Sequence, residues 1–249
     1  MKQMSKYIVS LYPTTKLLAV FFIIVSALMV SGYTYQYAIF PLMILIALLA
    51  DVVKQFLNIF IKTIVVIVLF IFIFQVFLIP GEEIIWEWSF LSISMEGFTN
   101  SLLITSKLIA VSSTLILFFQ VTPAKDLIYS MEKLGLSKKV SFVILSTLQL
   151  IPQMKDLSNT IMDAQRSRGI ETEGGLWVRI KAFVPMIGPL VLSSIEQTEE
   201  RVLTLESRAF SSTEKKTHVY HVGKSAKDTV VRIVILLLFI ILIGERFIS

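Results

Sequence analysis

Five apolar runs recur along the sequence, each close to the length that a helix needs to cross a bilayer. They are residues 17–30, 38–50, 63–80, 102–121 and 230–243. A helix crosses the hydrocarbon core with about 20 mostly apolar residues, and the shorter runs reach this length with their flanks. Only 16% of the residues are charged, against about 25% in a soluble domain. The sequence therefore predicts an all-α, polytopic membrane protein with about five transmembrane helices.

The cationic residues predict how the chain is oriented in the membrane. Three lysines precede the first apolar run, and Lys54 and Lys62 follow the second. Residues 81–101 carry four glutamates and no Lys or Arg. Because Lys and Arg are retained on the cytoplasmic side, we expect a multi-pass protein with a cytoplasmic N-terminus and an external segment 81–101. Five crossings then place the C-terminus outside.

Residues 123–228 are more polar than the apolar runs on either side. Residues 123–227 hold 15 Lys and Arg and 11 Asp and Glu, which is most of the charge of the chain. The apolar run 182–192 contains two prolines and is too short to span a membrane. We therefore expect three segments: four N-terminal transmembrane helices (1–122), a cytoplasmic domain of amphipathic helices (123–228) and a C-terminal transmembrane helix (229–249).

Amphipathic helices are expected within this polar domain. Pro123 and Gly135 mark the ends of a short helix, because Pro favours helix starts and Gly favours helix stops. Residues 140–165 have apolar side chains at helical spacing, which predicts a helix with one apolar face and a kink near Pro152. That face includes Val143, Leu148, Ile151 and Ile161. Such helices lie in the lipid interface or dock into grooves on partner proteins.

The sequence offers no catalytic, metal or cofactor site. It contains no cysteine, which excludes disulfides, thiolate metal ligands and a Cys nucleophile. His218 and His221 are the only histidines and lack a third metal ligand. The tripeptide Gly223-Lys224-Ser225 matches the end of a P-loop but has no Gly five residues upstream. We therefore expect a non-catalytic chain with no cofactor, no ATP site and no nucleic-acid partner.

Two short arginine motifs end the expected amphipathic helices. They are Arg166-Ser167-Arg168-Gly169 and, after a second such helix over about 190–208, Ser207-Arg208-Ala209. One interpretation is that each arginine caps the carbonyl groups at its helix end. The other is that a guanidinium on a rigid helix end docks on carboxylates or carbonyl oxygens in a groove of a partner. Two such helix ends in one domain favour docking.

With these motifs in this order, the chain resembles the transmembrane T component of energy-coupling factor (ECF) importers over nearly its whole length. In that family two Ala-Arg-Gly-type motifs insert into grooves of ATPases. The resemblance implies that Ser167-Arg168-Gly169, with Arg166 before it, and Ser207-Arg208-Ala209 are the docking residues. Residues 12–17 and 150–152 are similar to other stretches of the family. The chain departs from the family pattern with Ser for Ala in both motifs, Ala209 for Gly, and Thr14 and Gln149 for Arg.

The resemblance implies a coupling scaffold in the cell membrane. Its partners would be two ABC-type ATPase subunits, or a homodimer of one, and a small substrate-binding integral membrane subunit. Closure of the ATPases on ATP would move the helices that end at Arg168 and Arg208. The apolar face of these helices would pass the movement to the substrate-binding subunit, which imports a vitamin, a vitamin precursor or a metal ion.

Two other functions stay open from the residues alone. One is a substrate-conducting ABC permease subunit, which needs ATPases but no separate substrate-binding subunit. The other is a stand-alone polytopic transporter or enzyme, which needs carboxylates or broken helices inside the membrane. Lys107 and Gln75 are the notable long polar side chains of the predicted crossings. Lys107 either marks a transport pathway or snorkels to the outer surface.

Overall fold

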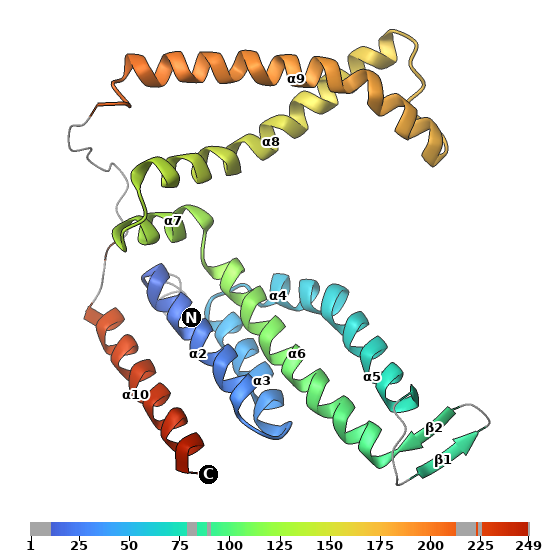
Figure 1. The fold of residues 1–249 in the computed structure, drawn as a ribbon, viewed down its shortest axis with the longest axis vertical. Helices are drawn as coiled ribbons and strands as arrows, with labels where there is room; N and C mark the ends of the chain where they lie inside the picture. Colours follow the sequence, from blue (N-terminus) through green and yellow to red (C-terminus); the bar gives the residue numbers. More distant parts are fainter. Residues whose placement is uncertain (1–10, 79–83, 89–90, 213–222, 224–225, 249) are drawn as a thin grey trace. The chain divides into compact units, whose positions relative to one another are not determined.

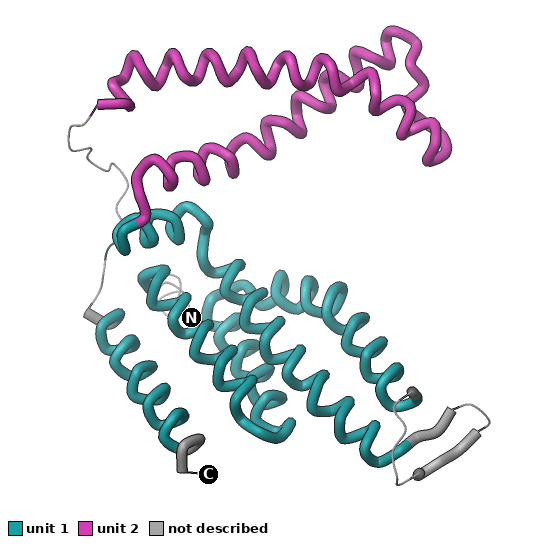
Figure 2. Tube along the Cα trace, viewed as in Figure 1, with its two compact units in different colours: residues 1–135, 222–249 teal, residues 136–221 magenta. Residues whose placement is uncertain are grey.

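The computed structural model describes the chain except for residues 1–10, 79–83, 89–90, 213–222, 224–225 and 249 (Figure 1). The described part is helical apart from one short antiparallel hairpin. Its contacts divide the chain into two compact units, residues 1–135 with 222–249 and residues 136–221 (Figure 2). The first unit is therefore built from the two ends of the sequence, and the second is inserted between them.

A helix occupies each of the five predicted crossings in the first unit. The helices are α2 (Pro13–Met29), α3 (Thr34–Leu49), the continuous α4 (Val53–Ile59), η1 (Phe60–Val65) and α5 (Val66–Leu78), then α6 (Met95–Val121) and α10 (Ala226–Ile248). The helix of the third crossing begins at Val53, ten residues before the apolar run 63–80. Its first turns mix polar and apolar residues, so they were not part of that run. The all-helical, polytopic architecture expected from the sequence is confirmed.

A short hairpin precedes α6 and was not expected from the sequence. Strands β1 (Ile84–Trp88) and β2 (Leu91–Ser94) pair antiparallel. Both strands are rich in Ile, Leu and Trp, which favour strands. With five and four residues, however, they are too short to show a clear alternation of polar and apolar side chains. The side chain of Ser94 then starts α6, because its Oγ accepts a hydrogen bond from the backbone N–H of Gly97 at 3.0 Å.

The core of the first unit lies where α2, α3, α4 and α6 meet, and small side chains let these helices approach closely. Its alanines are Ala27, Ala47, Ala50 and Ala110, packed with larger residues such as Met43 and Phe56. The buried serines and threonines of α6 satisfy their hydroxyls within their own helix. For example, Thr105 donates to the carbonyl oxygen of Ser101 at 2.6 Å and Thr114 to that of Ala110 at 2.8 Å. Small residues of this kind are typical of helix interfaces inside membranes.

The described parts of the chain place one end of four helices together. The backbone N–H of Tyr12, before α2, donates to Asp228 Oδ1 at the start of α10, at 2.8 Å. The ammonium of Lys16 donates to the carbonyl oxygen of Val121, at the end of α6, at 3.1 Å. The end of α3 contributes Ala50 to the same core as Val121. Helix α7 (Ala124–Lys133) follows at this end and stops before Gly135, whose φ is +117°, as the sequence predicted.

The second unit consists of two long helices that cross, α8 (Lys138–Ser167) and α9 (Leu176–Ser207) (Figure 1). Ile161 and Gln165 of α8 are buried at the crossing, as are Ala182 and Met186 of α9. Away from the crossing, Ser194 Oγ lies 3.5 Å from the sulfur of Met154. Ser137 caps the start of α8, since its Oγ accepts from the N–H of Val140 at 3.3 Å. The helix continues through Pro152, and the kink expected there stays a prediction.

The length of α9 corrects one expectation. The apolar run 182–192 is part of an uninterrupted helix of 32 residues, although Pro185 and Pro189 both lie inside it. An 18-residue window of α9 has a mean hydropathy of 1.5, so by length and composition alone α9 qualifies as a crossing, like Val53–Phe77 and Met95–Val121. The run 182–192 alone is too short to cross a membrane. The helix that contains it is longer, because Pro185 and Pro189 do not end it.

A side chain from α8 explains how α9 continues through its prolines. In a regular helix the carbonyl of Pro185 accepts from the N–H of residue 189, but Pro189 has no N–H. Gln165 replaces that donor, because its Nε2 lies 3.2 Å from the carbonyl oxygen of Pro185. Gln165 is 6% exposed, so the polar group it satisfies lies inside the crossing of the two helices.

Candidate functional site

The first arginine motif forms the C-terminal cap of α8. Ser167 is the last helical residue, Arg168 is the cap, and Gly169 follows with φ +87°. The N–H of Ile170 donates to the carbonyl oxygen of Gln165 at 3.1 Å, and the N–H of Gly169 to that of Arg166 at 2.9 Å. These two bonds define a Schellman motif, in which a left-handed residue after the cap turns the chain away from the helix.

The second motif has the same backbone geometry at the end of α9. Arg208 is the cap, and Ala209 takes the left-handed position with φ +55°. The N–H of Phe210 donates to the carbonyl oxygen of Leu205, and the N–H of Ala209 to that of Glu206, both at 2.9 Å. The replacement of Gly by Ala therefore leaves the turn intact, with the strain that an L side chain has in this conformation.

The backbone, rather than arginine side chains, satisfies the carbonyls at both helix ends. Within the described residues, the guanidinium groups of Arg168 and Arg208 make no hydrogen bond or ion pair, and both residues are exposed. The hydroxyls of Ser167 and Ser207 donate to carbonyl oxygens of their own helices, of Asp163 at 3.1 Å and Thr204 at 2.9 Å. The two cap arginines are thus held on rigid helix ends with their donors available to a partner.

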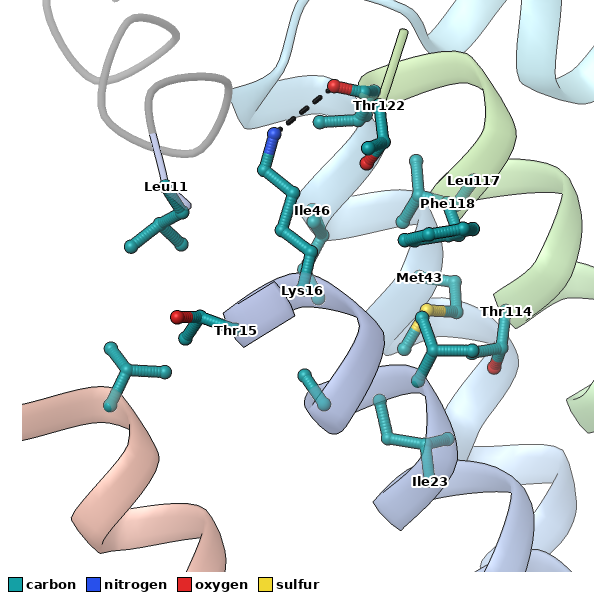
Figure 3. Close-up of a pocket in the computed structure, with 14 residues that line it drawn as sticks. Leu11, Thr15, Lys16, Ile23, Met43, Ile46, Thr114, Leu117, Phe118 and Thr122 are labelled. Carbon is teal, nitrogen blue, oxygen red and sulfur yellow. Dashed lines mark hydrogen bonds between the residues drawn. The ribbon is translucent and has the colours of Figure 1, made fainter. Parts of the chain in front are cut away.

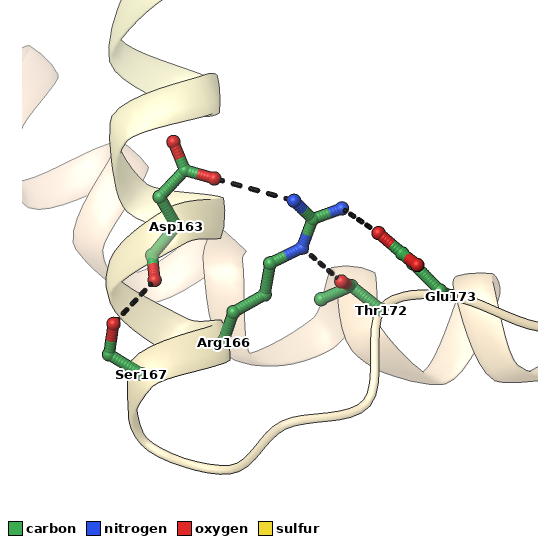
Figure 4. Close-up of polar contacts among 5 residues, drawn as sticks. All are labelled: Asp163, Arg166, Ser167, Thr172 and Glu173. Carbon is green, nitrogen blue, oxygen red and sulfur yellow. Dashed lines mark hydrogen bonds and ion pairs between the residues drawn. The ribbon is translucent and has the colours of Figure 1, made fainter.

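Arg166 behaves differently from the two cap arginines, although the sequence grouped it with them. Its guanidinium lies 3.5 Å from Asp163 Oδ1 and 3.2 Å from Glu173 Oε1, and its Nε donates to Thr172 Oγ1 (Figure 4). Each exposed ion pair contributes about 0.2–1 kcal/mol, but three contacts on one guanidinium form a network. Arg166 therefore ties the loop after the first motif back to α8.

The expected apolar face of α8 is divided by the crossing with α9. Val143, Leu148 and Ile151 are 60%, 42% and 63% exposed, whereas Ile161 is 9% exposed. Ile161 is therefore buried inside the second unit and is not part of its exposed surface. The other three residues leave an apolar surface on α8, and exposed apolar surface of this extent is typical of contact with lipid or with another protein.

A polar cluster joins the two ends of the chain, and the sequence did not reveal it. Arg232 of α10 donates to Thr15 Oγ1 at 2.8 Å and to Thr14 Oγ1 at 2.6 Å. Its guanidinium carbon lies 5.8 Å from the ring centroid of Tyr12, and Asp228, which accepts from Tyr12, is 3% exposed. Burial raises the pKa of the Tyr12 phenol above its ordinary value of 10.0. The available signal was the pair of charges, four residues apart, at the start of the last apolar run.

No three His, Asp or Glu side chains come together as a metal site among the residues that the structure describes. His218, His221, Lys224 and Ser225 lie outside the described residues. Lys107 is half-buried in α6. The features that stand out for function are therefore the two cap arginines and the exposed apolar faces of α8 and α9.

Comparison with known proteins gives a consistent result over nearly the whole chain. A family model described as CbiQ, cobalt transport protein, matches residues 4–219. The chain is 29% identical to the energy-coupling factor transporter transmembrane protein EcfT of Staphylococcus aureus, over 96% of this chain and 92% of that protein. It is 27% identical to the EcfT protein of Acidaminococcus fermentans, over 92% and 89%. It is 30% identical to that of Bacillus selenitireducens, over 73% and 71%.

Proposed function

The chain belongs to the CbiQ family and is a non-catalytic transmembrane component of an energy-coupling factor transporter, and from this premise we propose that Arg168 and Arg208 are its two docking points on the ATPase subunits. The observation that supports the proposal most is the Schellman hydrogen-bond pattern that the two helix ends share. It holds both guanidinium groups on rigid supports while the backbone meets the carbonyls. A guanidinium has five donors in a fixed fork, which suits carboxylates and carbonyl oxygens in a groove.

The remaining motif residues shape the docking surface. Gly169 and Ala209 turn the chain away after each cap, so that nothing follows the arginine along the helix axis. Ser167 and Ser207 keep their hydroxyls on the helix backbone. In this proposal Arg166 positions the loop after the first motif through Asp163 and Glu173 and leaves the contact with the ATPase to Arg168.

The partners are two ABC-type ATPase subunits, or a homodimer of one, and a small substrate-binding integral membrane subunit. Closure of the ATPases on ATP moves the ends of α8 and α9 relative to each other about their crossing. The exposed apolar residues Val143, Leu148 and Ile151 then carry the movement to the substrate-binding subunit. That subunit releases a vitamin, a vitamin precursor or a metal ion into the cell.

The orientation in the cell membrane follows from charge. With the N-terminus in the cytoplasm, the joined ends of α2, α3, α6 and α10 face the cytoplasm, because Lys16 and Arg232 lie there. The second unit leaves the bundle from α7 at this same end. The docking arginines are then on the side of the membrane where ATP is present.

The proposal is tested by purifying the tagged chain from its own membranes in mild detergent and identifying bound proteins by mass spectrometry. We expect ABC-type ATPases together with a small, very hydrophobic membrane protein. Arg168→Ala combined with Arg208→Ala should lower recovery of the ATPases at least about tenfold, as the loss of central interface arginines does. Recovery of the hydrophobic subunit should change less.

The matched control is Lys155→Ala, which removes an exposed cation in the middle of α8, away from both caps. Equal losses in the control and in the double variant would show that the charge of the unit matters and the caps do not. Recovery of ATPases without a small hydrophobic subunit would instead support a substrate-conducting permease. Unchanged recovery and substrate uptake in the double variant would contradict the docking role.

A further inference from the structure

We infer that the first unit holds one acyl chain of an anionic phospholipid in a pocket between α2, α3, α6 and α10, with the lipid phosphate at Lys16 and Thr122. The pocket encloses about 230 Å³ and is partly open (Figure 3). All of its lining residues belong to the first unit. The inference concerns a lipid site and is independent of ATPase docking.

The body of the pocket suits a hydrocarbon chain. Its walls are aliphatic and aromatic side chains, among them Ile23 of α2, Met43 of α3, and Leu117 and Phe118 of α6 (Figure 3). Ala19 lines it too. Thr114 lies in this wall, but its hydroxyl already donates to the carbonyl oxygen of Ala110. An apolar cavity that offers so few free polar groups excludes water and accepts an apolar guest.

One polar group in the pocket is unexplained by the protein itself. The hydroxyl of Thr122 is buried and has no hydrogen-bond partner among the described residues, and Thr122 is 4% exposed. A buried hydroxyl without a partner is costly, so a ligand oxygen that reached it would remove that cost. Thr122 lines the pocket directly after α6 ends at Val121, which is the level where lipid headgroups begin.

A cation lies at the same level of the pocket. Lys16 lines it, and its ammonium reaches the carbonyl oxygen of Val121, the residue before Thr122 (Figure 3). Asp126 and Asp228 act electrostatically on this ammonium from α7 and α10, and Asp228 is already engaged by the N–H of Tyr12. An anionic phosphate placed between Lys16 and Thr122 would take both an ion pair and the missing hydrogen bond.

These observations select a lipid of the bilayer as the occupant. The pocket lies among membrane helices, its polar groups sit where α2 begins and α6 ends, and its depth is apolar. With a cytoplasmic N-terminus, the site faces the leaflet where basic pockets between helices bind anionic headgroups. A free anion would leave the apolar depth empty, and a neutral lipid would leave Lys16 without a counter-charge from the ligand.

The test is native mass spectrometry of the full chain, purified with its bound subunits in mild detergent. Phosphatidylglycerol, phosphatidylcholine with the same acyl chains, and inorganic phosphate are added in separate arms. We expect one phosphatidylglycerol retained in preference to phosphatidylcholine and to phosphate. Ala19→Trp, which fills the pocket, should abolish retention of that lipid. Lys16→Gln should lower its retention about fivefold, the effect of one lysine near an anionic surface.

Two further variants separate a site from a general effect of charge or folding. Lys54→Gln removes an exposed lysine of α4 outside the pocket, and it should leave retention unchanged. Thr122→Val removes the unpartnered hydroxyl at constant shape, so the variant should melt at least as high as the wild type without lipid. It should gain less from added phosphatidylglycerol. Equal retention in Ala19→Trp and wild type, or equal losses in Lys54→Gln and Lys16→Gln, would overturn the inference.

Discussion

Gly169 and Ala209 occupy equivalent left-handed positions, and only one of them is glycine. An L residue in this conformation costs roughly 1–2 kcal/mol, whereas glycine adopts it readily. A Cβ added to Gly169 would meet no atom within 4 Å, so a substitution there costs only backbone strain. Substitutions at these two positions therefore report the backbone strain of a left-handed residue at a helix cap, without a steric clash of the side chain.

We predict that Gly169→Ala weakens the first cap and Ala209→Gly strengthens the second. Each change is about 1 kcal/mol after allowing for the extra freedom of glycine in the unfolded chain. Hydrogen exchange at the amides of Ile170 and Phe210 should become about fivefold faster and slower, respectively. Gly188→Ala is the control, because Gly188 lies inside α9 without a positive φ and an added Cβ there also meets nothing. An equally large loss of protection in Gly188→Ala would refute the explanation by strain.

The sequence identified the arginine motifs but could not rank their arginines. Arg166 and Arg168 lie two residues apart in the same basic motif, yet among the described residues only the side chain of Arg166 has partners within its own unit. The distinction depends on where the loop after α8 brings Thr172 and Glu173. That loop is set by the Schellman turn, which a pattern of residue types indicates only in part.

At the scale of elements, the continuity of α9 depends on a side chain of α8. Helical periodicity predicted both amphipathic helices and their C-terminal ends. It could not predict that α9 passes through Pro185 and Pro189 without breaking, because the donor that compensates comes from Gln165, twenty residues away from the carbonyl it serves. Hydropathy likewise located the five crossings, while the hairpin of β1 and β2 was too short to be predicted.

We predict that Gln165→Leu opens α9 locally around its prolines. The variant leaves the partly buried carbonyl of Pro185 without a donor, at a cost of about 1 kcal/mol. Hydrogen exchange in the middle of α9 should accelerate accordingly, while the ends of α9 change less. Pro189→Ala restores a backbone N–H to that carbonyl, so the double variant should exchange more slowly than Gln165→Leu alone. Failure of this rescue would show that Gln165 acts through packing and not through its hydrogen bond.

At the scale of the whole molecule, the last helix joins the membrane unit by returning to the first. Tyr12, Thr14 and Thr15 on one side meet Asp228 and Arg232 on the other, more than 200 residues apart in sequence. Charge and hydropathy give each helix separately, but neither tells which of them pair. The sequence division into 1–122, 123–228 and 229–249 remains a prediction, since compactness alone does not tell which residues lie in lipid.

We predict that Asp228→Ala destabilises the first unit by about 1.5–3 kcal/mol, the range for a hydrogen bond to a charged group. The substitution leaves the buried N–H of Tyr12 without its acceptor. Thermal unfolding of the purified chain should occur at a lower temperature. Glu200→Ala, at an exposed position of α9, should leave it unchanged. An unaltered unfolding temperature in Asp228→Ala would show that α10 is held by its apolar contacts, such as Phe22 with Phe239.

The joining of the two chain ends also bears on how the protein is made. Translation releases the N-terminal helices first, and α10 last, after the whole of α8 and α9. Until then the hydroxyls of Thr14 and Thr15 have no guanidinium to bind, although the core shared by α2, α3, α4 and α6 can already form. Contacts of such long sequence separation close slowly. A ribosome that stops before residue 228 therefore leaves a chain that carries both cap arginines but lacks the last helix of its membrane unit.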